Sequence, residues 1–111
     1  MKITIIRQKA TSSKIIGMLK ALDNYIKLAV DIERQILAGG GELHADCEEA
    51  LINDGSSQEN IWGVDWYPVT KKVFFESLIN IRPKQDNNSL FIQNSKIRNL
   101  VEKIVRTFLE V

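Results

Sequence analysis

Four side chains suited to binding a metal ion lie close together in this 111-residue chain. Asp31 and Glu33 alternate along one stretch, and Glu42 and the only histidine, His44, alternate along a second stretch after three glycines. In an extended chain, alternate side chains point to the same face. Two neighbouring strands would therefore place all four on one polar surface. Carboxylate oxygens suit hard divalent cations, and imidazole suits zinc, manganese or iron.

A divalent metal held by Asp31, Glu33, Glu42 and His44 would lower the pKa of a bound water and so allow hydrolysis of a phosphoester or a similar bond. In this hypothesis Glu42 and His44 are the candidate catalytic residues, with Glu33 or Glu42 as general base. The alternative is that the four are solvated charges, balanced by basic neighbours. Their spacing matches no named metal motif, so the sequence does not decide between a metal site and solvated surface charges.

A second group of polar residues follows a later apolar stretch. Asn80 and Arg82 lie near its end, and Ser89 lies in the polar loop beyond. An arginine at the end of a strand, facing free backbone N–H groups, suits a phosphate or a carboxylate. An internal ion pair from Arg82 to the acidic cluster is the alternative, and it would remove the need for a metal. Asn80, Arg82 and Ser89 are the candidate binding residues.

Several named chemistries are excluded by missing residues. Residues 44–47 lack the His-x-Glu and the paired cysteines of zinc deaminases. Cys47 is the only cysteine, which excludes an intramolecular disulfide and a cysteine-rich zinc site. The glycine run at 39–41 lacks the Lys-Ser/Thr of a phosphate loop. Trp62 and Trp66 share one face of an apparent strand, which indicates core packing rather than base stacking.

The overall composition indicates a single cytoplasmic domain spanning residues 1–111. Fifteen basic and fourteen acidic residues give a net charge of +1. A general nucleic-acid binder would show a basic excess, so there is no strong nucleic-acid signal. No apolar segment reaches the roughly 20 residues that span a bilayer. The first six residues are too short an apolar run for a signal peptide.

The elements that must position these residues follow from hydrophobic periodicity. Alternating apolar residues predict strands, and apolar residues three and four apart predict helices. Asp46 and Glu49 have the spacing of a capping box at the start of a helix. The predicted strands cover residues 1–6, 26–33, 36–43, 61–67 and 73–82, and the predicted helices cover 12–23, 46–53 and a final segment from Ser95.

The resulting order, β-α-β-β-α-β-β-α, predicts an α+β fold of two layers. Short links and half-polar strands favour a mostly antiparallel or mixed sheet with the helices on one face. The opposite face would be polar and would carry Asp31, Glu33, Asp65, Asn80 and Arg82, with Glu42 and His44 beside them.

Three ordered motifs carry a resemblance to a known family. They are Gly-Gly-Glu-Leu-His-Ala-Asp at 40–46, Gln-Glu-Asn-Ile-Trp-Gly at 58–63 and Leu-Ile-Asn-Ile-Arg-Pro at 78–83. The chain resembles a family of small bacterial and archaeal single-domain proteins of unknown function. The resemblance implies a stand-alone domain and supplies no activity, cofactor or partner. The chain departs from the family pattern at Cys47, where alanine is expected, and at Asn88, where an arginine would precede Ser89.

Two functions therefore follow from the sequence. The first is a non-enzymatic binding protein that uses the polar sheet face around Glu42, His44 and Arg82, with a homodimer among the arrangements allowed. This reading predicts that Arg82→Ala disrupts a partner contact and leaves the fold intact. The alternative is a divalent-metal-dependent hydrolase that uses the same acidic and histidine cluster. No motif decides whether the protein is an enzyme.

Overall fold

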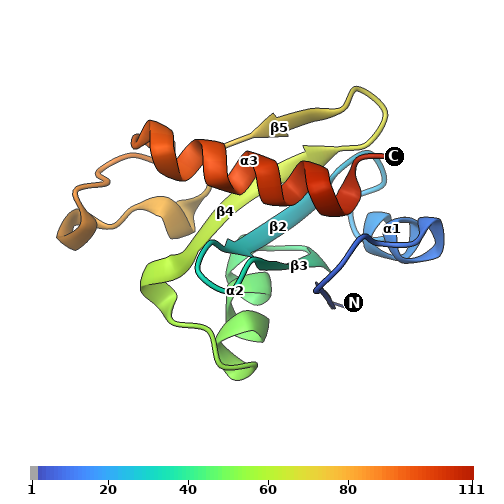
Figure 1. The fold of residues 1–111 in the computed structure, drawn as a ribbon, viewed down its shortest axis with the longest axis horizontal. Helices are drawn as coiled ribbons and strands as arrows, with labels where there is room; N and C mark the ends of the chain where they lie inside the picture. The colour runs from blue at the N-terminus through green and yellow to red at the C-terminus, as the bar shows by residue number, and fades with distance from the viewer. Residues whose placement is uncertain (1–2) are drawn as a thin grey trace.

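The computed structural model describes residues 3–111, so Met1 and Lys2 of the first predicted strand lie outside it. The helices and strands follow the predicted order, and the α+β class is confirmed (Figure 1). Short 3₁₀ helices η1, η2 and η3 lie in the connections. The elements are β1 Thr4–Ile6, α1 Ser12–Leu19, β2 Ile26–Asp31, β3 Ile36–Gly41, α2 His44–Asn53, η1 Gln58–Asn60, β4 Ile61–Tyr67, β5 Lys72–Phe74, η2 Leu78–Asn80, η3 Pro83–Gln85 and α3 Ser95–Leu109.

Within the described residues the strands form one five-stranded sheet in the order β1-β3-β2-β4-β5. Every neighbouring pair is antiparallel, which confirms the antiparallel prediction. β1 and β5 are the two edges. β2 lies at the centre, and its residues are paired on both sides, by β3 and by β4.

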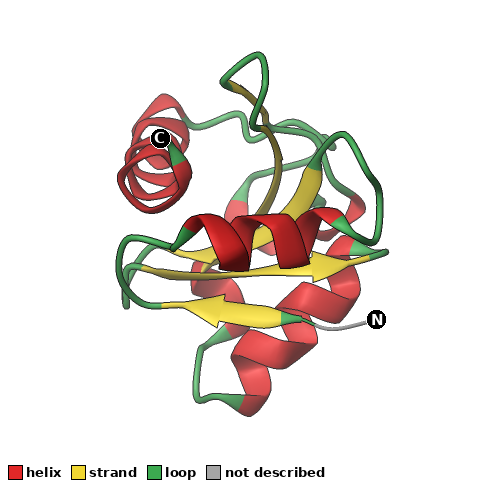
Figure 2. Ribbon diagram, turned by 90° about the vertical axis from the view of Figure 1, so that its right-hand side faces the viewer, coloured by secondary structure: helices red, strands yellow, loops and turns green. Residues whose placement is uncertain are grey.

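Helices cover both faces of the sheet, which corrects the prediction of helices on one face (Figure 2). α1 and α3 pack with Trp62, Val64 and Trp66 on one face. α2 packs on the other face, where Ala29 and Ala38 are fully buried. The alternation of Ala29 with charged residues resembled a polar face, but small alanine side chains let a helix approach the strands closely. The sheet is therefore the middle of three layers.

The glycine run contains a β-bulge that sets the path into α2. The pairing between β2 and β3 shifts between Lys27 and Leu28, so that Gly40 is the extra residue. Gly40 has φ +101°, which glycine adopts without strain. Gly39 is also constrained, because a Cβ there would lie 2.7 Å from the Leu28 side chain. The bulge directs the chain from β3 across the sheet into α2.

α2 begins earlier than the capping box predicts. Its N-cap is Leu43, which makes no side-chain capping bond, and Asp46 lies in the first turn instead. His44 is consequently the first residue of the helix rather than part of the link between the predicted strand 36–43 and the predicted helix 46–53. This places its ring on the α2 side of the sheet.

The last predicted strand, 73–82, is wrong beyond Phe74. Ser77 accepts a hydrogen bond from Ile79 N and caps η2, which bends the chain. The Asn80 side chain then takes the place of a β-strand next to β4: its Oδ1 accepts from Gly63 N at 2.8 Å and its Nδ2 donates to Gly63 O at 2.9 Å. Because a side chain supplies these two bonds, β5 is short.

Candidate binding surface around His44

The proposed metal ligands do not converge. Asp31 pairs with Ile36 at one end of the β2–β3 pair, and Lys27 pairs with Gly41, next to Glu42, at the other end. At the rise of an antiparallel strand, these ends are about 14 Å apart. Among residues 3–111, no group of three or more histidine, cysteine or acidic side chains is arranged to hold a metal ion.

Asp31 is instead the last residue of β2, and Glu33 lies in the turn between β2 and β3. The fully buried Asp31 carboxylate accepts hydrogen bonds from Glu33 N and Arg34 N, both at 2.9 Å through Oδ1. This is an Asx-type turn, in which a side chain satisfies two backbone donors. Glu33 is exposed at the turn. The acidic pair that suggested a ligand set is therefore explained by a local backbone requirement at Asp31.

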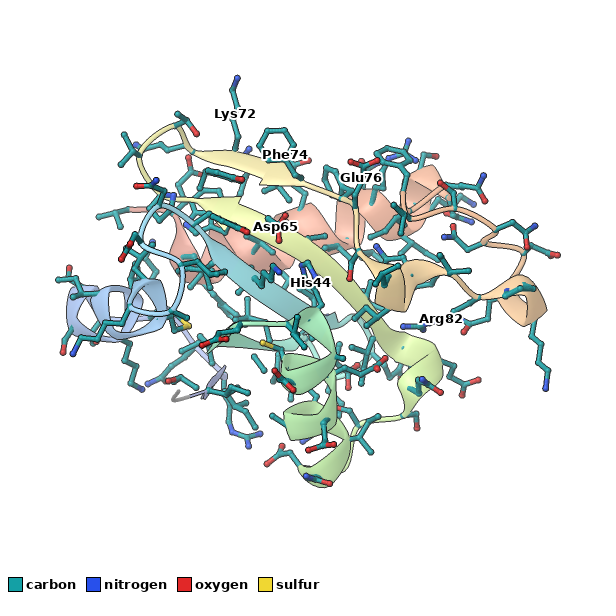
Figure 3. All side chains as sticks on the ribbon, turned by 180° about the vertical axis from the view of Figure 1, so that it is seen from behind. His44, Asp65, Lys72, Phe74, Glu76 and Arg82 are labelled. Carbon is teal, nitrogen blue, oxygen red and sulfur yellow. The ribbon has the colours of Figure 1, made fainter. Side chains whose placement is uncertain are left out.

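His44 forms a hydrogen-bonded pair with Asp65 of β4 (Figure 3). His44 Nε2 lies 2.8 Å from Asp65 Oδ1 and 3.2 Å from the Val64 carbonyl oxygen. Both partners are acceptors, so Nε2 carries the hydrogen, and in the neutral ring Nδ1 is the acceptor nitrogen. The His44 side chain is 12% exposed and that of Asp65 18%. The pair is therefore mostly buried, and a small part of each side chain reaches solvent.

Cross-strand register brings further residues to this face. Asp65 lies opposite Lys27 of β2 and opposite Phe74 of β5, and residues directly opposite in a ladder share a face. Lys27 Nζ donates to the backbone carbonyl of Glu42 at 3.0 Å, which fastens the end of the bulged segment. This face of the sheet is therefore formed by β2, β4 and β5, with the start of α2 beside it.

A pocket of about 260 Å³ opens beside His44. Its border is apolar and strongly exposed: Leu43 is 57% exposed and Leu78 is 77% exposed. We call Lys27, Leu43, His44, Asp65 and Leu78 the His44 surface. The pocket is lined by Lys27, Leu43, His44, Ala45, Ser77, Leu78 and Ile79.

Ser77 is the hydroxyl residue of this pocket and the natural candidate for a nucleophile next to a His–Asp pair. Its hydroxyl oxygen accepts from Ile79 N as the cap of η2. Within the described residues, no hydrogen bond joins Ser77 to His44. A nucleophile activated by a base needs that contact. The observed arrangement therefore places the serine in a structural role.

Arg82 is largely buried, and its guanidinium is engaged by groups of its own chain. Its side chain is 9% exposed, and its Nη2 lies 3.6 Å from Glu48 Oε2 of α2. The guanidinium donates to three backbone carbonyls and stacks over the Trp62 ring, 4.7 Å from its centroid. Burial lowers the pKa of Arg82, and the nearby negative charge of Glu48 raises it in part. The carbonyls belong to Gln58 at 2.7 Å, Ile79 at 3.0 Å and Ile61.

Asn80 and Ser89 also serve the fold. Beyond Gly63, Asn80 Nδ2 reaches the carbonyls of Phe75 at 3.3 Å and Leu90 at 3.0 Å. Ser89 Oγ accepts from Phe91 N at 3.1 Å in a local turn. The candidate binding residues therefore hold the segment that follows β5, and none of them reaches the His44 surface.

The sequence identified His44 as a site residue, but it did not predict that Asp65 bonds directly to the His44 ring. Asp65 was placed on the polar face with His44, but nothing in their spacing indicated a direct bond between α2 and β4. Glu48 was missed as the partner of Arg82. The available signal was helical spacing, because Glu48 follows His44 by four residues and so lies on the same side of α2.

Cys47 is expected to resist alkylation in the folded protein. Its side chain is fully buried, and burial raises the pKa of the thiol from 9.0 to about 11. At pH 8 this lowers the thiolate population about 100-fold. Iodoacetamide should modify the folded protein at least 100-fold more slowly than the urea-unfolded chain, as followed by mass spectrometry. Equal rates in the two states would contradict the buried, protonated thiol.

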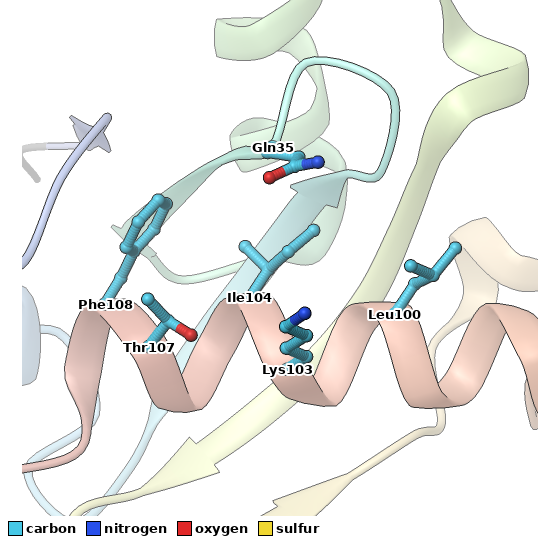
Figure 4. A pocket seen from close by; sticks show the side chains of 6 residues that line it. All are labelled: Gln35, Leu100, Lys103, Ile104, Thr107 and Phe108. Carbon is cyan, nitrogen blue, oxygen red and sulfur yellow. The ribbon is translucent and has the colours of Figure 1, made fainter.

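A second depression lies on the opposite side of the sheet, between α3 and the β2–β3 turn (Figure 4). It measures about 170 Å³, and its ionisable lining group is Lys103. A single ammonium gives no acid–base pair and no ligand set. The lining residues are Gln35, Leu100, Lys103, Ile104, Thr107 and Phe108.

Comparison with known proteins identifies a family and no activity. The family model described as "Protein of unknown function (DUF5674)" matches residues 4–108. Neither a curated protein nor a solved structure matches the chain significantly. Within the described residues, no helix is long and apolar enough to cross a membrane. The resemblance to a family of unknown function is confirmed.

Proposed function

The chain belongs to the DUF5674 family of proteins of unknown function, and we propose that it is a non-enzymatic interaction protein that binds a polypeptide segment at the His44 surface. The observation that carries this proposal is the pocket beside His44 with its exposed border of Leu43 and Leu78. Exposed leucines around a concave site are costly in water and gain free energy when a partner covers them.

The polar groups of this surface suit recognition better than turnover. The His44–Asp65 pair and Lys27 stand among apolar neighbours, as in binding sites where a few polar groups fix the orientation of the ligand. The nearby hydroxyl of Ser77 is engaged in capping, and the acidic residues of the β2–β3 turn are remote. These contacts favour a bound peptide whose apolar side chain enters the pocket.

The partner chemistry follows from the lining. A pocket of about 260 Å³ accommodates one or two side chains of the partner rather than a cofactor. The leucine border suits an apolar anchor, and the polar groups suit the peptide backbone beside it. A polypeptide segment meets both requirements, since it carries apolar side chains and backbone donors and acceptors at fixed spacing.

Peptide display tests this proposal with a defined probe. A random peptide library selected on the folded chain should yield sequences with a shared apolar anchor. Their affinity should fall roughly tenfold or more for Leu78→Glu, which places a charge on the border of the pocket. The matched control is Ile16→Glu, since Ile16 is 60% exposed on α1, across the sheet. Selected peptides that bind wild type and Leu78→Glu equally would overturn the proposal.

A further inference from the structure

Another pocket lies between α1 and the edge strand β1, on the face of the sheet opposite the His44 surface. It measures about 380 Å³. Ile5 packs on the α2 side of β1 and Ile6 packs on the α1 side, so alternation along the strand turns Thr4 toward α1 (Figure 2). We call this the α1 pocket. Its lining residues are Thr4, Ser13, Lys14, Gly17 and Lys20.

Gly17 lies in the interior of α1, where neither the backbone conformation nor the packing requires a glycine. Its φ is not positive, and a Cβ at this position would meet no atom within 4 Å. At Gly39 and Gly63, by contrast, a Cβ would lie 2.7 Å and 2.6 Å from a neighbouring side-chain atom. Glycine in a helix interior is less favourable than alanine. A bare position of this kind is suited to a ligand that lies directly against the helix backbone.

The two lysines of the α1 pocket flank Gly17. At about 3.6 residues per turn, Lys14 and Lys20 lie roughly 60° to either side of Gly17 around α1, just under one turn before it and after it. Ser13 precedes Gly17 by four residues and so lies on the same side of the helix. Thr4 faces this side from β1. Two cationic side chains and two hydroxyl groups therefore surround the open position at Gly17.

The positive charge of the α1 pocket is not neutralised by the described chain. Within residues 3–111, the ammonium groups of Lys14 and Lys20 form no ion pair and no hydrogen bond. None of the described residues that line the pocket is acidic, and the first turn of α1 holds no acidic side chain. The free N–H groups at the start of a helix add partial positive charge. The α1 pocket therefore favours an anion.

We propose that the α1 pocket binds a phosphate group, either as the free ion or as part of a small phosphate monoester. A phosphate monoester carries nearly two negative charges at neutral pH and has three terminal acceptor oxygens. Two ammonium groups match that charge, and the hydroxyls of Thr4 and Ser13 supply further donors. A carboxylate carries one charge and would leave one lysine unpaired. The volume of the pocket leaves room for an organic group beside the phosphate.

Titration of the full chain with inorganic phosphate and with phenyl phosphate tests the inference. Each probe should shift the amide NMR signals of Ser13 and Gly17, with dissociation constants in roughly the millimolar range, and added NaCl should weaken both. Phenol, which has the same ring without the phosphate, should leave these signals unchanged. Tighter binding of phenyl phosphate would identify a monoester as the ligand, and equal binding would identify the free ion.

Substitutions in the lining separate the site from the fold. Gly17→Leu should fill the pocket and abolish phosphate binding. Its melting temperature should equal or exceed that of wild type, because leucine favours a helix and its Cβ meets no neighbour. Lys14→Ala with Lys20→Ala should weaken binding about tenfold or more. The matched control is Lys72→Ala with Lys84→Ala, an equal charge change at exposed lysines outside the pocket, which should bind phosphate as wild type does.

The outcomes distinguish this inference from peptide binding at the His44 surface. Leu78→Glu should leave phosphate binding unchanged, and Gly17→Leu should leave peptide affinity unchanged. Titrations in which neither phosphate probe shifts Ser13 or Gly17 would overturn the phosphate site. So would shifts that survive replacement of both Lys14 and Lys20, or shifts that phenol reproduces, because the ligand would then be bound without recognition of its charge.

Discussion

Replacing Arg82 with alanine is expected to lower the free energy of unfolding by about 3–5 kcal/mol. The substitution leaves Glu48 largely buried without its cation, and burial of an unpaired carboxylate is strongly destabilising. It also removes the donors for three backbone carbonyls and the cation that stacks on Trp62. Urea denaturation followed by tryptophan fluorescence measures this loss.

Two further variants separate the causes. Lys84→Ala removes an exposed positive charge nearby and should change stability by less than about 0.5 kcal/mol. The double variant Arg82→Met with Glu48→Leu replaces the ion pair by apolar groups and should recover part of the loss, because no carboxylate remains unpaired. A loss below about 1 kcal/mol for Arg82→Ala would contradict the internal role of Arg82 and restore the partner-contact reading.

Replacing Asn80 with alanine is expected to cost about 3–4 kcal/mol of unfolding free energy. The Asn80 amide is fully buried and satisfies both Gly63 N and Gly63 O, as well as the carbonyls of Phe75 and Leu90. Alanine leaves Gly63 N and Gly63 O without the bonds that the amide supplies, whereas the carbonyls of Phe75 and Leu90 keep their bonds from Ile92 N and Ser77 N. The exposed Asn88 provides the control, and Asn88→Ala should stay within about 0.5 kcal/mol of wild type.

A nearly isosteric substitution at the same position tests the hydrogen-bond explanation. Asn80→Asp keeps the shape but turns the donor into an acceptor that faces three carbonyls. Burial and those carbonyls favour the neutral acid, so the folded pKa of the new carboxyl is raised above its unfolded value. Its protonated form stabilises the fold at acid pH, and this contribution is lost as pH rises through the folded pKa. A stability deficit that does not shrink on acidification would contradict this account.

The sequence was most informative where periodicity was regular. Trp62, Val64 and Trp66 alternate without interruption, and all three are buried on the face that α1 and α3 cover. The prediction was wrong where an amide side chain replaced a strand. Apolar residues continue past Phe74 with strand-like spacing, yet Asn80 occupies the hydrogen-bonding groups of Gly63. The spacing of apolar residues indicates which side chains are buried. It does not reveal which groups form hydrogen bonds with the backbone N–H and C=O groups.

The candidate site was predicted in part for a similar reason. His44 and Asp65 were both assigned to a polar face, and the structure joins them. Asp31 and Glu33 were grouped with His44 because alternation says which face a side chain takes but not how far along the strand it lies. The antiparallel register of β2 and β3 separates the two groups, and register depends on the whole sheet.

The contacts of Arg82 and Asn80 change the meaning of the motifs that identify the family. Residues 58–63 and 78–83 bind each other: Arg82 holds the carbonyls of Gln58 and Ile61, and Asn80 holds Gly63. These two family motifs therefore describe one structural contact, between the start of β4 and the segment from η2 to η3. A search with these motifs finds chains that share this contact, and it does not identify what those chains bind. Lys27 and Asp65 of the His44 surface lie outside all three motifs, so the family motifs do not specify the whole of that surface.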